Sequence, residues 1–273
     1  MKSSVPISHK AAPWLAVLFL LLVWELGVRL YNLPGYILAS PSQVLAVMTD
    51  IYPALCFHGG MTLLEAVSGF ILAIIAAFIM AFMLDRCLWL NRAVYPLLII
   101  SQTIPLIVLA VLFTIWFGFG LLPKILVVIL VCFFPVVISL SNGLREVDPD
   151  QLNLFRSMGA SPLKTFTMVK LPAALPAFFA GIRISATYSI MAAVIAEWLG
   201  SNRGLGYYMT LQQKQFAIDR VLAAVAIICL LSLLLVKLID LSEYLLIPWN
   251  RSHGPSLSRE DYEQKQSGDK SIE

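Results

Sequence analysis

Charged side chains stand inside or beside several long apolar stretches of this sequence, where they are placed to do chemistry. Glu25 and Arg29 lie one helical turn apart near the end of the first stretch. This spacing favours a mutual ion pair, with a role in transport as the alternative. Glu197 lies near the end of a later stretch, where a carboxylate can either pair with Arg203 or close an outer gate.

Uncharged polar residues also interrupt the apolar stretches. Gln102 and Thr103 precede Pro105 in the middle of one of them. At membrane depth, such residues are tolerated where neighbouring helices or a water-filled cavity satisfy the freed backbone groups. We therefore expect them to line a translocation path, with hydrogen bonds that stabilise a kink as the alternative. A second polar cluster, in the stretch that contains Glu197, is assigned to the same path: Ser185, Tyr188 and Ser189.

The common motifs of catalysis are absent from the sequence. It has no G-x-x-x-x-G-K-[ST] loop to hold phosphates, so this chain is not expected to hydrolyse ATP on its own. The three histidines lie in separate regions, and the four cysteines are scattered without a C-x-x-C pair. We expect no catalytic residue, no metal site and no cofactor bound by this chain.

Composition indicates the class of protein that positions these residues. Hydrophobic residues make up 59% of the 273 residues and charged residues only 13%, which is typical of a polytopic membrane protein. The small net charge of +3 gives no reason to expect a nucleic-acid partner. We predict an all-α fold with six transmembrane helices, because six apolar stretches are long enough to cross a bilayer. The predicted spans are 13–30, 62–84, 94–117, 122–141, 178–199 and 221–239.

The distribution of cations predicts the orientation in the membrane. We take the first stretch as a retained span rather than a cleaved signal peptide. With the N-terminus inside, the inner segments carry twelve Lys and Arg residues and the outer loops carry four. Because inner loops are enriched in these residues, both termini are predicted to be cytoplasmic. The long loop between the fourth and fifth spans then also faces the cytoplasm.

That loop, residues 145–178, contains two helix starts in quick succession. Asp148-Pro149 and Ser161-Pro162 each predict an N-cap followed by a proline in the first helical turn. Gly159 supplies a flexible residue at which the first short helix can end. Leu171-Pro172 is expected to stop or kink the second helix before the next span begins.

The first short helix of the loop carries an apolar ridge. Leu152, Phe155 and Met158 follow one another at three-residue spacing in a segment that is otherwise polar. An apolar ridge outside both core and lipid requires a partner surface. The alternative is that the ridge folds back onto the helix ends of the same chain.

The same loop carries a family resemblance. It keeps Gly159, Leu171 and Pro172 in register, with Val169 two residues before Leu171. This arrangement resembles the cytoplasmic loop of binding-protein-dependent ABC importer permeases, which has the form E-A-A, three residues, G, about nine residues, I-x-L-P. The sequence departs from that pattern at the triplet, where Asn153-Leu154-Phe155 lacks the glutamate. The resemblance therefore implies the helix and its elbow, whereas the ionic contact of the glutamate is lost.

Further fragments extend the resemblance over about 33–211, and the subfamily that the chain resembles most is the nitrate, taurine and alkanesulfonate type. The fragments follow the family's order: Leu38-Ala39-Ser40-Pro41-Ser42, Gly69-Phe70, Trp116-Phe117-Gly118-Phe119-Gly120, Ala196-Glu197 and Gly204-Leu205-Gly206-Tyr207. The resemblance implies the type I ABC importer permease fold and a loop that couples to an ATPase. The implied coupling residues are Asn153, Leu154, Phe155, Arg156, Met158, Gly159, Ala160, Ser161, Leu171 and Pro172.

The resemblance also implies the partners. We expect two ATPase subunits that hold ATP and Mg, a second and identical permease copy, an extracytoplasmic solute-binding protein, and the lipid of a bacterial cytoplasmic membrane. The expected solute is a small anion such as a sulfonate, nitrate or taurine, and a pyrimidine or vitamin precursor is the alternative. A different class of function is an ion-coupled secondary transporter that relays charge through Glu25, Arg29 and Glu197. A third is a membrane scaffold that transports nothing.

The expected domain organisation follows the spans. Residues 1–57 form an N-terminal span and an outer loop, and residues 58–247 form the permease domain, which includes the coupling loop. Residues 248–273 form a polar cytoplasmic tail.

Overall fold

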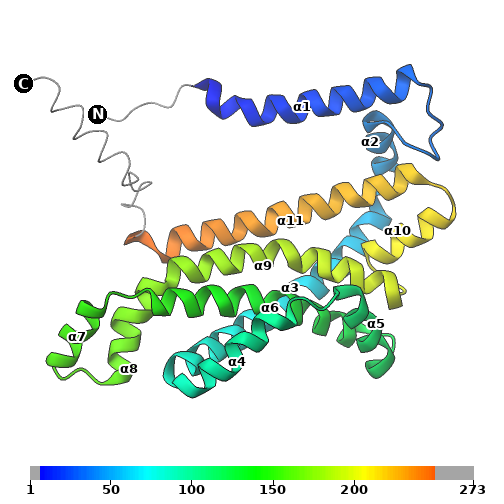
Figure 1. Cartoon of the computed structure of the whole chain (residues 1–273). Coiled ribbons are helices and arrows are strands. Elements are labelled where there is room, and N and C mark those ends of the chain that lie inside the picture. Colours follow the sequence, from blue (N-terminus) through cyan, green and yellow to red (C-terminus); the bar gives the residue numbers. More distant parts are fainter. Residues whose placement is uncertain (1–6, 250–273) are drawn as a thin grey trace, which may run out of the picture.

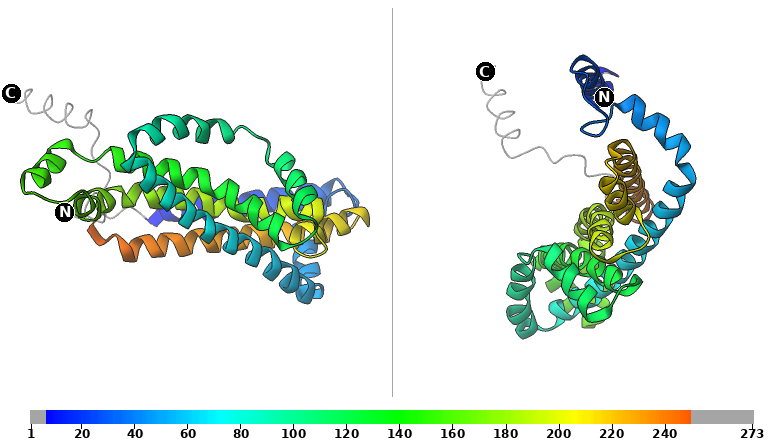
Figure 2. Two further views of the ribbon diagram at one scale, coloured as in Figure 1. Left: turned by 90° about the horizontal axis from the view of Figure 1, so that it is seen from below. Right: turned by 90° about the vertical axis from the view of Figure 1, so that its right-hand side faces the viewer.

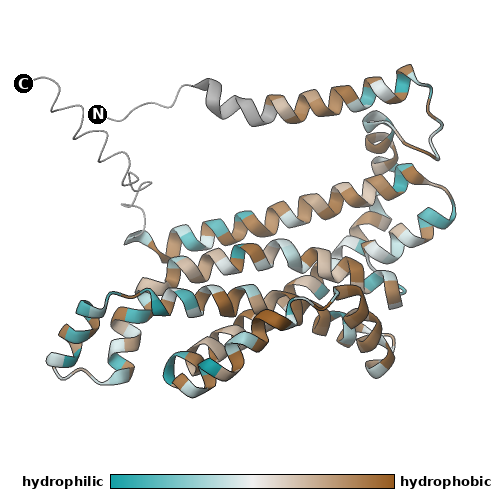
Figure 3. Cartoon of the chain, viewed as in Figure 1, coloured by the Kyte–Doolittle hydropathy of each residue, from teal (hydrophilic) through white to brown (hydrophobic). Residues whose placement is uncertain are grey.

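The computed structural model describes residues 7–249, and this part of the chain contains helices and no strand (Figure 1). Figure 3 shows that apolar residues dominate the long helices, whereas hydrophilic residues gather on the short helices α7 and α8. The helices are α1 (Ile7–Leu30), α2 (Pro41–Asp50), α3 (Tyr52–Arg86), α4 (Leu88–Ser101), α5 (Leu106–Phe117), α6 (Leu121–Arg145), α7 (Pro149–Ser157), α8 (Pro162–Thr165), α9 (Leu171–Gly200), α10 (Leu205–Lys214) and α11 (Ile218–Leu246), with a π-helix over Phe166–Lys170.

Four helical segments within residues 7–249 are long and apolar enough to cross a membrane, by length and composition. They are Tyr52–Arg86, Leu121–Arg145, Pro162–Gly200 and Ile218–Leu246. The bent pair of α4 and α5 adds a fifth if the two count as one span. The predicted first span coincides with α1, whose apolar side chains from Leu15 to Leu22 are exposed.

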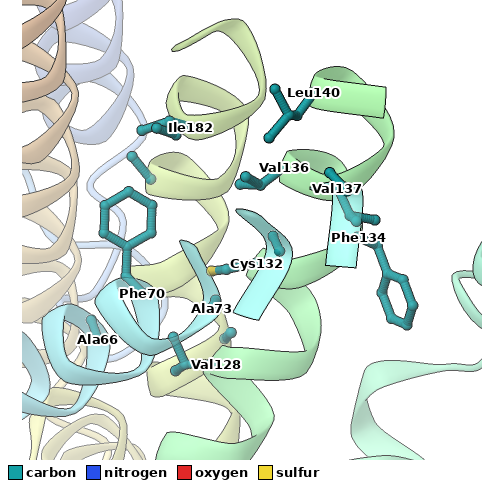
Figure 4. Close-up of a cluster of buried hydrophobic side chains, with 14 of the residues drawn as sticks. Ala66, Phe70, Ala73, Val128, Cys132, Phe134, Val136, Val137, Leu140 and Ile182 are labelled. Atoms are coloured by element: carbon teal, nitrogen blue, oxygen red, sulfur yellow. The ribbon is translucent and has the colours of Figure 1, made fainter. Parts of the chain in front are cut away.

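The core forms where α3 and α9 pack on α6. Small residues allow the close approach, since Ala66, Ala73 and Ala77 of α3 are fully buried. A Cβ at Gly69 would lie 2.6 Å from the Cβ of Val128 on α6, so only glycine fits there. Figure 4 shows side chains of all three helices in this cluster: Phe70 from α3, Cys132, Val136 and Leu140 from α6, and Ile182 from α9.

The predicted span 94–117 is two helices rather than one. The chain leaves α4 at Ser101 and enters α5 at Leu106, and the two helix axes differ by 98°. Pro105 has no amide hydrogen and disfavours helical conformation in the residue before it, so it explains the break. A bend of this size exceeds an ordinary proline kink, and it places Gln102 and Thr103 in a turn.

The helix α1 stands apart from the bundle in the views of Figures 1 and 2. It meets the remainder of the chain at α2, a short helix that lies within the loop predicted between the first two spans. Arg29 Nε lies 2.6 Å from Glu25 Oε1, which confirms the predicted ion pair. The Glu25 carboxylate also accepts hydrogen bonds from the backbone N–H and the hydroxyl of Ser42, at 3.0 and 2.8 Å, and so anchors the start of α2.

Candidate functional site

The loop after α6 forms the predicted pair of short helices. The Asp148 side chain accepts a hydrogen bond from the Asp150 N–H at 2.9 Å, and Ser161 accepts one from the Lys164 N–H at 3.3 Å. Both predicted N-caps are thereby confirmed. Gly159 has φ +74°, a left-handed conformation that disfavours side chains, and a Cβ there would have open space around it. The elbow is therefore set by backbone geometry and not by packing.

The proline after the loop does not stop the second helix. Instead the chain continues from α8 through the π-helix into α9, and Pro172 lies in the first turn of α9. The wider π-turn over Phe166–Lys170 adjusts the helix register just before the position where Pro172 lacks an amide hydrogen. Of the two outcomes expected at Leu171-Pro172, a stop or a kink, the stop is therefore wrong. The consequence is that the loop is joined rigidly to the membrane helix α9.

The loop is also fastened to α3. Lys170 Nζ lies 2.7 Å from Asp85 Oδ1, and both side chains are mostly buried. The ring of Phe166 packs edge-on against Phe82 with centroids 4.8 Å apart. Neither Asp85 nor Phe82 was singled out from the sequence, because nothing local relates them to residues more than 80 positions away.

The tip of the loop leaves apolar side chains uncovered. Met158 is 74% exposed and Leu154 is 58% exposed, whereas Leu152 and Phe155 of the predicted ridge are half-buried. Asn153, Arg156 and Ser161 are exposed around them. The loop therefore presents an apolar tip with a polar rim, a pattern suited to a groove on another protein.

The turn between α4 and α5 opens onto a cavity of about 390 Å³. Four of the six residues predicted for a translocation path line it, namely Gln102, Thr103, Pro105 and Tyr188. Phe134 and Met191 complete an apolar wall. None of the side chains that line this cavity is charged. It offers amide and hydroxyl groups beside an aromatic ring.

Ser185 and Ser189 lie outside this cavity. Both side chains are fully buried. Ser185 donates to the Cys132 carbonyl of α6 at 2.8 Å, and Ser189 donates to the Ala186 carbonyl of its own helix at 2.9 Å. Their hydroxyls are satisfied by backbone acceptors in the core, so we leave them out of the path proposed below.

The side chain of Glu197, near the end of α9, reaches the start of α10 and does not pair with Arg203. Its carboxylate accepts from the Thr62 hydroxyl at 2.7 Å and from the Gly206 N–H at 2.6 Å. The Arg203 guanidinium instead lies over the ring of Phe57, 6.0 Å from its centroid. The considered pairing with Arg203 is therefore wrong. The first amides of a helix have no partner within the helix, and a carboxylate stabilises them.

Thr62 and one further side chain, His58, complete the cap of α10. The Leu205 N–H donates to the Thr62 hydroxyl at 2.8 Å, and the Gly204 N–H donates to His58 Nδ1 at 3.1 Å. Gly204 has φ +101°, and a Cβ there would overlap the Glu197 carboxylate. Side chains of α3 and α9 thus hold the segment from Gly204 onward against the bundle.

A buried ion pair lies next to this cap, and sequence reasoning missed it. Lys124 Nζ of α6 lies 2.6 Å from Glu65 Oε1 of α3, one helical turn along from Thr62, and it also donates to Ser201 at 2.7 Å. The sequence does not single out Lys124 and Glu65 as partners, because they lie 59 positions apart in two separate predicted spans. The lone carboxylate of Glu65 among apolar residues is the sequence signal that could have identified this site.

The charged residues proposed for a relay are not brought into one chain of contacts. Glu25 and Arg29 pair with each other beside α2, whereas Glu197 caps α10. All three side chains are thus held by structural contacts, which give no support to the ion-coupled alternative.

Comparisons with known proteins agree with this architecture. The family model described as binding-protein-dependent transport system inner membrane component matches residues 69–252. The formylaminopyrimidine transport permease protein ThiX of Halalkalibacterium halodurans is 35% identical over 240 residues, which are 88% of this chain and 96% of the relative. The taurine transport system permease protein TauC of Escherichia coli is 28% identical over 253 residues, which are 90% and 92% of the two chains.

A solved structure shows the same fold. A chain from the inward-facing conformations of the MetNI methionine ABC transporter aligns with a TM-score of 0.59, at 18% identity, over 70% of this chain and 97% of that chain.

Proposed function

Since this chain belongs to the family of binding-protein-dependent transport system inner membrane components, with a type I ABC importer permease fold, we propose that it forms the solute path of an ATP-driven importer. It is a multi-pass protein of the inner membrane. In this proposal ATP and Mg are bound by separate ATPase subunits, a second identical copy completes the path, and an extracytoplasmic protein delivers the solute. Both termini and the loop 145–178 face the cytoplasm.

The observation that carries this proposal is the way the loop is mounted. Its apolar tip at Leu154 and Met158 is free to enter a groove of an ATPase. Its base is continuous with α9 and is tied to α3 through Lys170 and Asp85. A push on the tip is therefore passed to two membrane helices that pack on α6. Two packings of these helices, biased by the ATPase, would open the path alternately to each side.

The cavity at the α4–α5 turn supports an uncharged solute over an anion. A sulfonate buried there would lack a cation, because no charged side chain lines the cavity. Gln102, Thr103 and Tyr188 offer donors and acceptors, and Phe134 offers a ring face, which suits a planar nitrogen heterocycle. The relative ThiX is named for formylaminopyrimidine and TauC for taurine. We propose a neutral heterocycle of the pyrimidine type and keep a small sulfonate as the second candidate.

The test is uptake by proteoliposomes that contain the permease, its ATPase and its binding protein. We expect ATP-dependent uptake of a labelled aminopyrimidine that excess unlabelled taurine does not compete away. Taurine uptake without pyrimidine uptake would overturn the choice of solute. Uptake that needs no ATPase would overturn the proposed mechanism.

A further inference from the structure

A second polar cavity lies at the opposite end of the bundle from the cap of α10. It has a volume of about 480 Å³ and lies between the end of α3, the start of α4 and the end of α6. The Asp85–Lys170 pair places it beside the base of the loop. None of the predicted site residues lines it, and the proposed transport mechanism does not use it.

Two guanidinium groups line this cavity without an acidic partner. The Arg145 side chain donates to the Asn91 amide oxygen and lies over the Tyr95 ring, 4.6 Å from its centroid. These contacts fix its position but leave its charge uncompensated. Arg92 lines the same cavity, and within residues 7–249 no carboxylate forms an ion pair with either arginine. The one acid that lines the cavity, Asp85, is already paired with Lys170. The cavity is therefore net positive.

A buried hydroxyl in the lining also lacks a partner. Ser141 is 3% exposed, lines the cavity, and its Oγ has no hydrogen-bond partner in the described part of the chain. A buried polar atom without a partner costs free energy, so native structures supply one. A hydroxyl donor together with two guanidinium groups matches the oxygens of a phosphate.

The other wall of the cavity is apolar. Ala81 and Leu84 are buried along it, and Leu88 lies at its rim with 68% of its surface exposed. Trp89, the next residue, is also exposed. Tryptophan is enriched where membrane meets water, and basic pockets between membrane helices on the inner side accept lipid headgroups. A ligand with both a phosphate and acyl chains fits these two walls better than a free anion does.

We propose that this cavity binds the phosphate headgroup of an anionic phospholipid of the inner leaflet, held by Arg92, Arg145 and the Ser141 hydroxyl. The lipid would fill the space between α4 and the bundle and support the helices to which the coupling loop is fastened.

The experiment uses the full-length permease in a zwitterionic detergent, with phosphatidylglycerol as the probe and native mass spectrometry as the readout. We expect one phosphatidylglycerol retained per chain, and a lipid-dependent rise in Tm. Arg92→Gln/Arg145→Gln should weaken binding on the order of thirtyfold, and Ser141→Ala several-fold. Arg86→Gln is the matched control, because Arg86 is an exposed arginine at the end of α3 outside the cavity, and binding should be unchanged.

Two results would overturn the proposal. One is retention of phosphatidylglycerol by Arg92→Gln/Arg145→Gln at the wild-type level. The other is a rise in Tm with millimolar inorganic phosphate alone that cancels the effect of the lipid, since the cavity would then take a soluble oxyanion. If the double variant does not fold, Ser141→Ala decides, because the Ser141 hydroxyl makes no hydrogen bond within the described residues.

Discussion

Lys124 of α6 and Glu65 of α3 form an ion pair of 2.6 Å in which both side chains are buried. A buried ion pair contributes little net free energy to folding, because the cost of removing two charges from water is about as large as the gain from their attraction. The loss of one partner alone destabilises the fold, because the other charge is then buried without a partner. The pair thus fixes how α3 and α6 meet at the end of the bundle near α10.

We predict that Lys124→Met and Glu65→Gln each destabilise the permease by about 3–5 kcal/mol, with a marked fall in Tm. The double variant Glu65→Gln/Lys124→Met should recover most of that loss, because neither charge remains. Thermal unfolding in detergent measures all three. Arg29→Gln is the control, since the Arg29 side chain is 68% exposed, and its Tm should match the wild type. Single variants as stable as the wild type would show that the pair does not hold these helices together.

The cap of α10 predicts the effect of altering Glu197. In Glu197→Gln one of the two carboxylate oxygens becomes an NH2 group, so either the Gly206 N–H loses its acceptor or the Thr62 hydroxyl must donate to the His58 carbonyl alone. The expected cost is about 1–3 kcal/mol. Hydrogen exchange should rise at the first amides of α10 and remain unchanged in α9 on the inner side. Unchanged protection of α10 would contradict the capping role.

Gly204 gives an independent test of the same cap. Gly204→Ala forces a side chain into a left-handed conformation and into the Glu197 carboxylate, so a lower Tm and impaired uptake are expected. Gly60→Ala is the matched change, because Gly60 lies on α3 with nothing within 4 Å of its added Cβ. That variant should be as stable as the wild type. Equal behaviour of the two would mean that the contact with Glu197 does not matter.

The coupling loop and the cap of α10 show what the sequence could and could not predict. The N-caps at Asp148 and Ser161 and the turn at Gly159 follow from local chemistry, and the sequence predicts them. Thr62 and Glu197 are 135 positions apart. Their contact depends on how α3 and α9 pack, which no local pattern encodes. Composition alone could not reveal the partner of Lys124 either, because a cation at a helix end is expected to face water.

The break between α4 and α5 is predictable from the sequence only in part. The polar residues before Pro105 predict a disruption, whereas the angle of 98° depends on the packing of α5 against α6. The continuity of the loop with α9 is not predicted from the sequence, because Pro172 favours either a stop or a kink and the sequence pattern does not reveal the π-helix before it.

The path cavity predicts a change in solute affinity on altering Gln102. Gln102→Leu removes the amide that lines the cavity, and KM for uptake should rise about tenfold while the ATPase rate without solute is unchanged. Ser232→Ala is the control, because its hydroxyl only bonds back to the Ile228 carbonyl of α11. An unchanged KM in Gln102→Leu would place the path elsewhere.

Two substitutions of Gly159 distinguish the effect of backbone strain from the effect of contact with the ATPase. Gly159→Ala should cost about 1–2 kcal/mol through its left-handed conformation and retain the bound ATPase. Gly159→Trp should cost a similar amount but lose the ATPase in co-purification, because the ring would project beside the exposed tip. Gly35→Trp, in an open position on the outer side, is the control. Full ATPase association with Gly159→Trp would refute the docking of this tip.

Accessibility labelling of Ser157→Cys tests the central claim most directly. In a background from which the four native cysteines are removed, an impermeant maleimide should label this residue in inverted vesicles and not in intact cells. Co-expression of the ATPase should slow that labelling, since Ser157 lies in α7 next to the exposed tip. Labelling in intact cells would put the loop on the outer face and contradict the coupling of this loop to an ATPase.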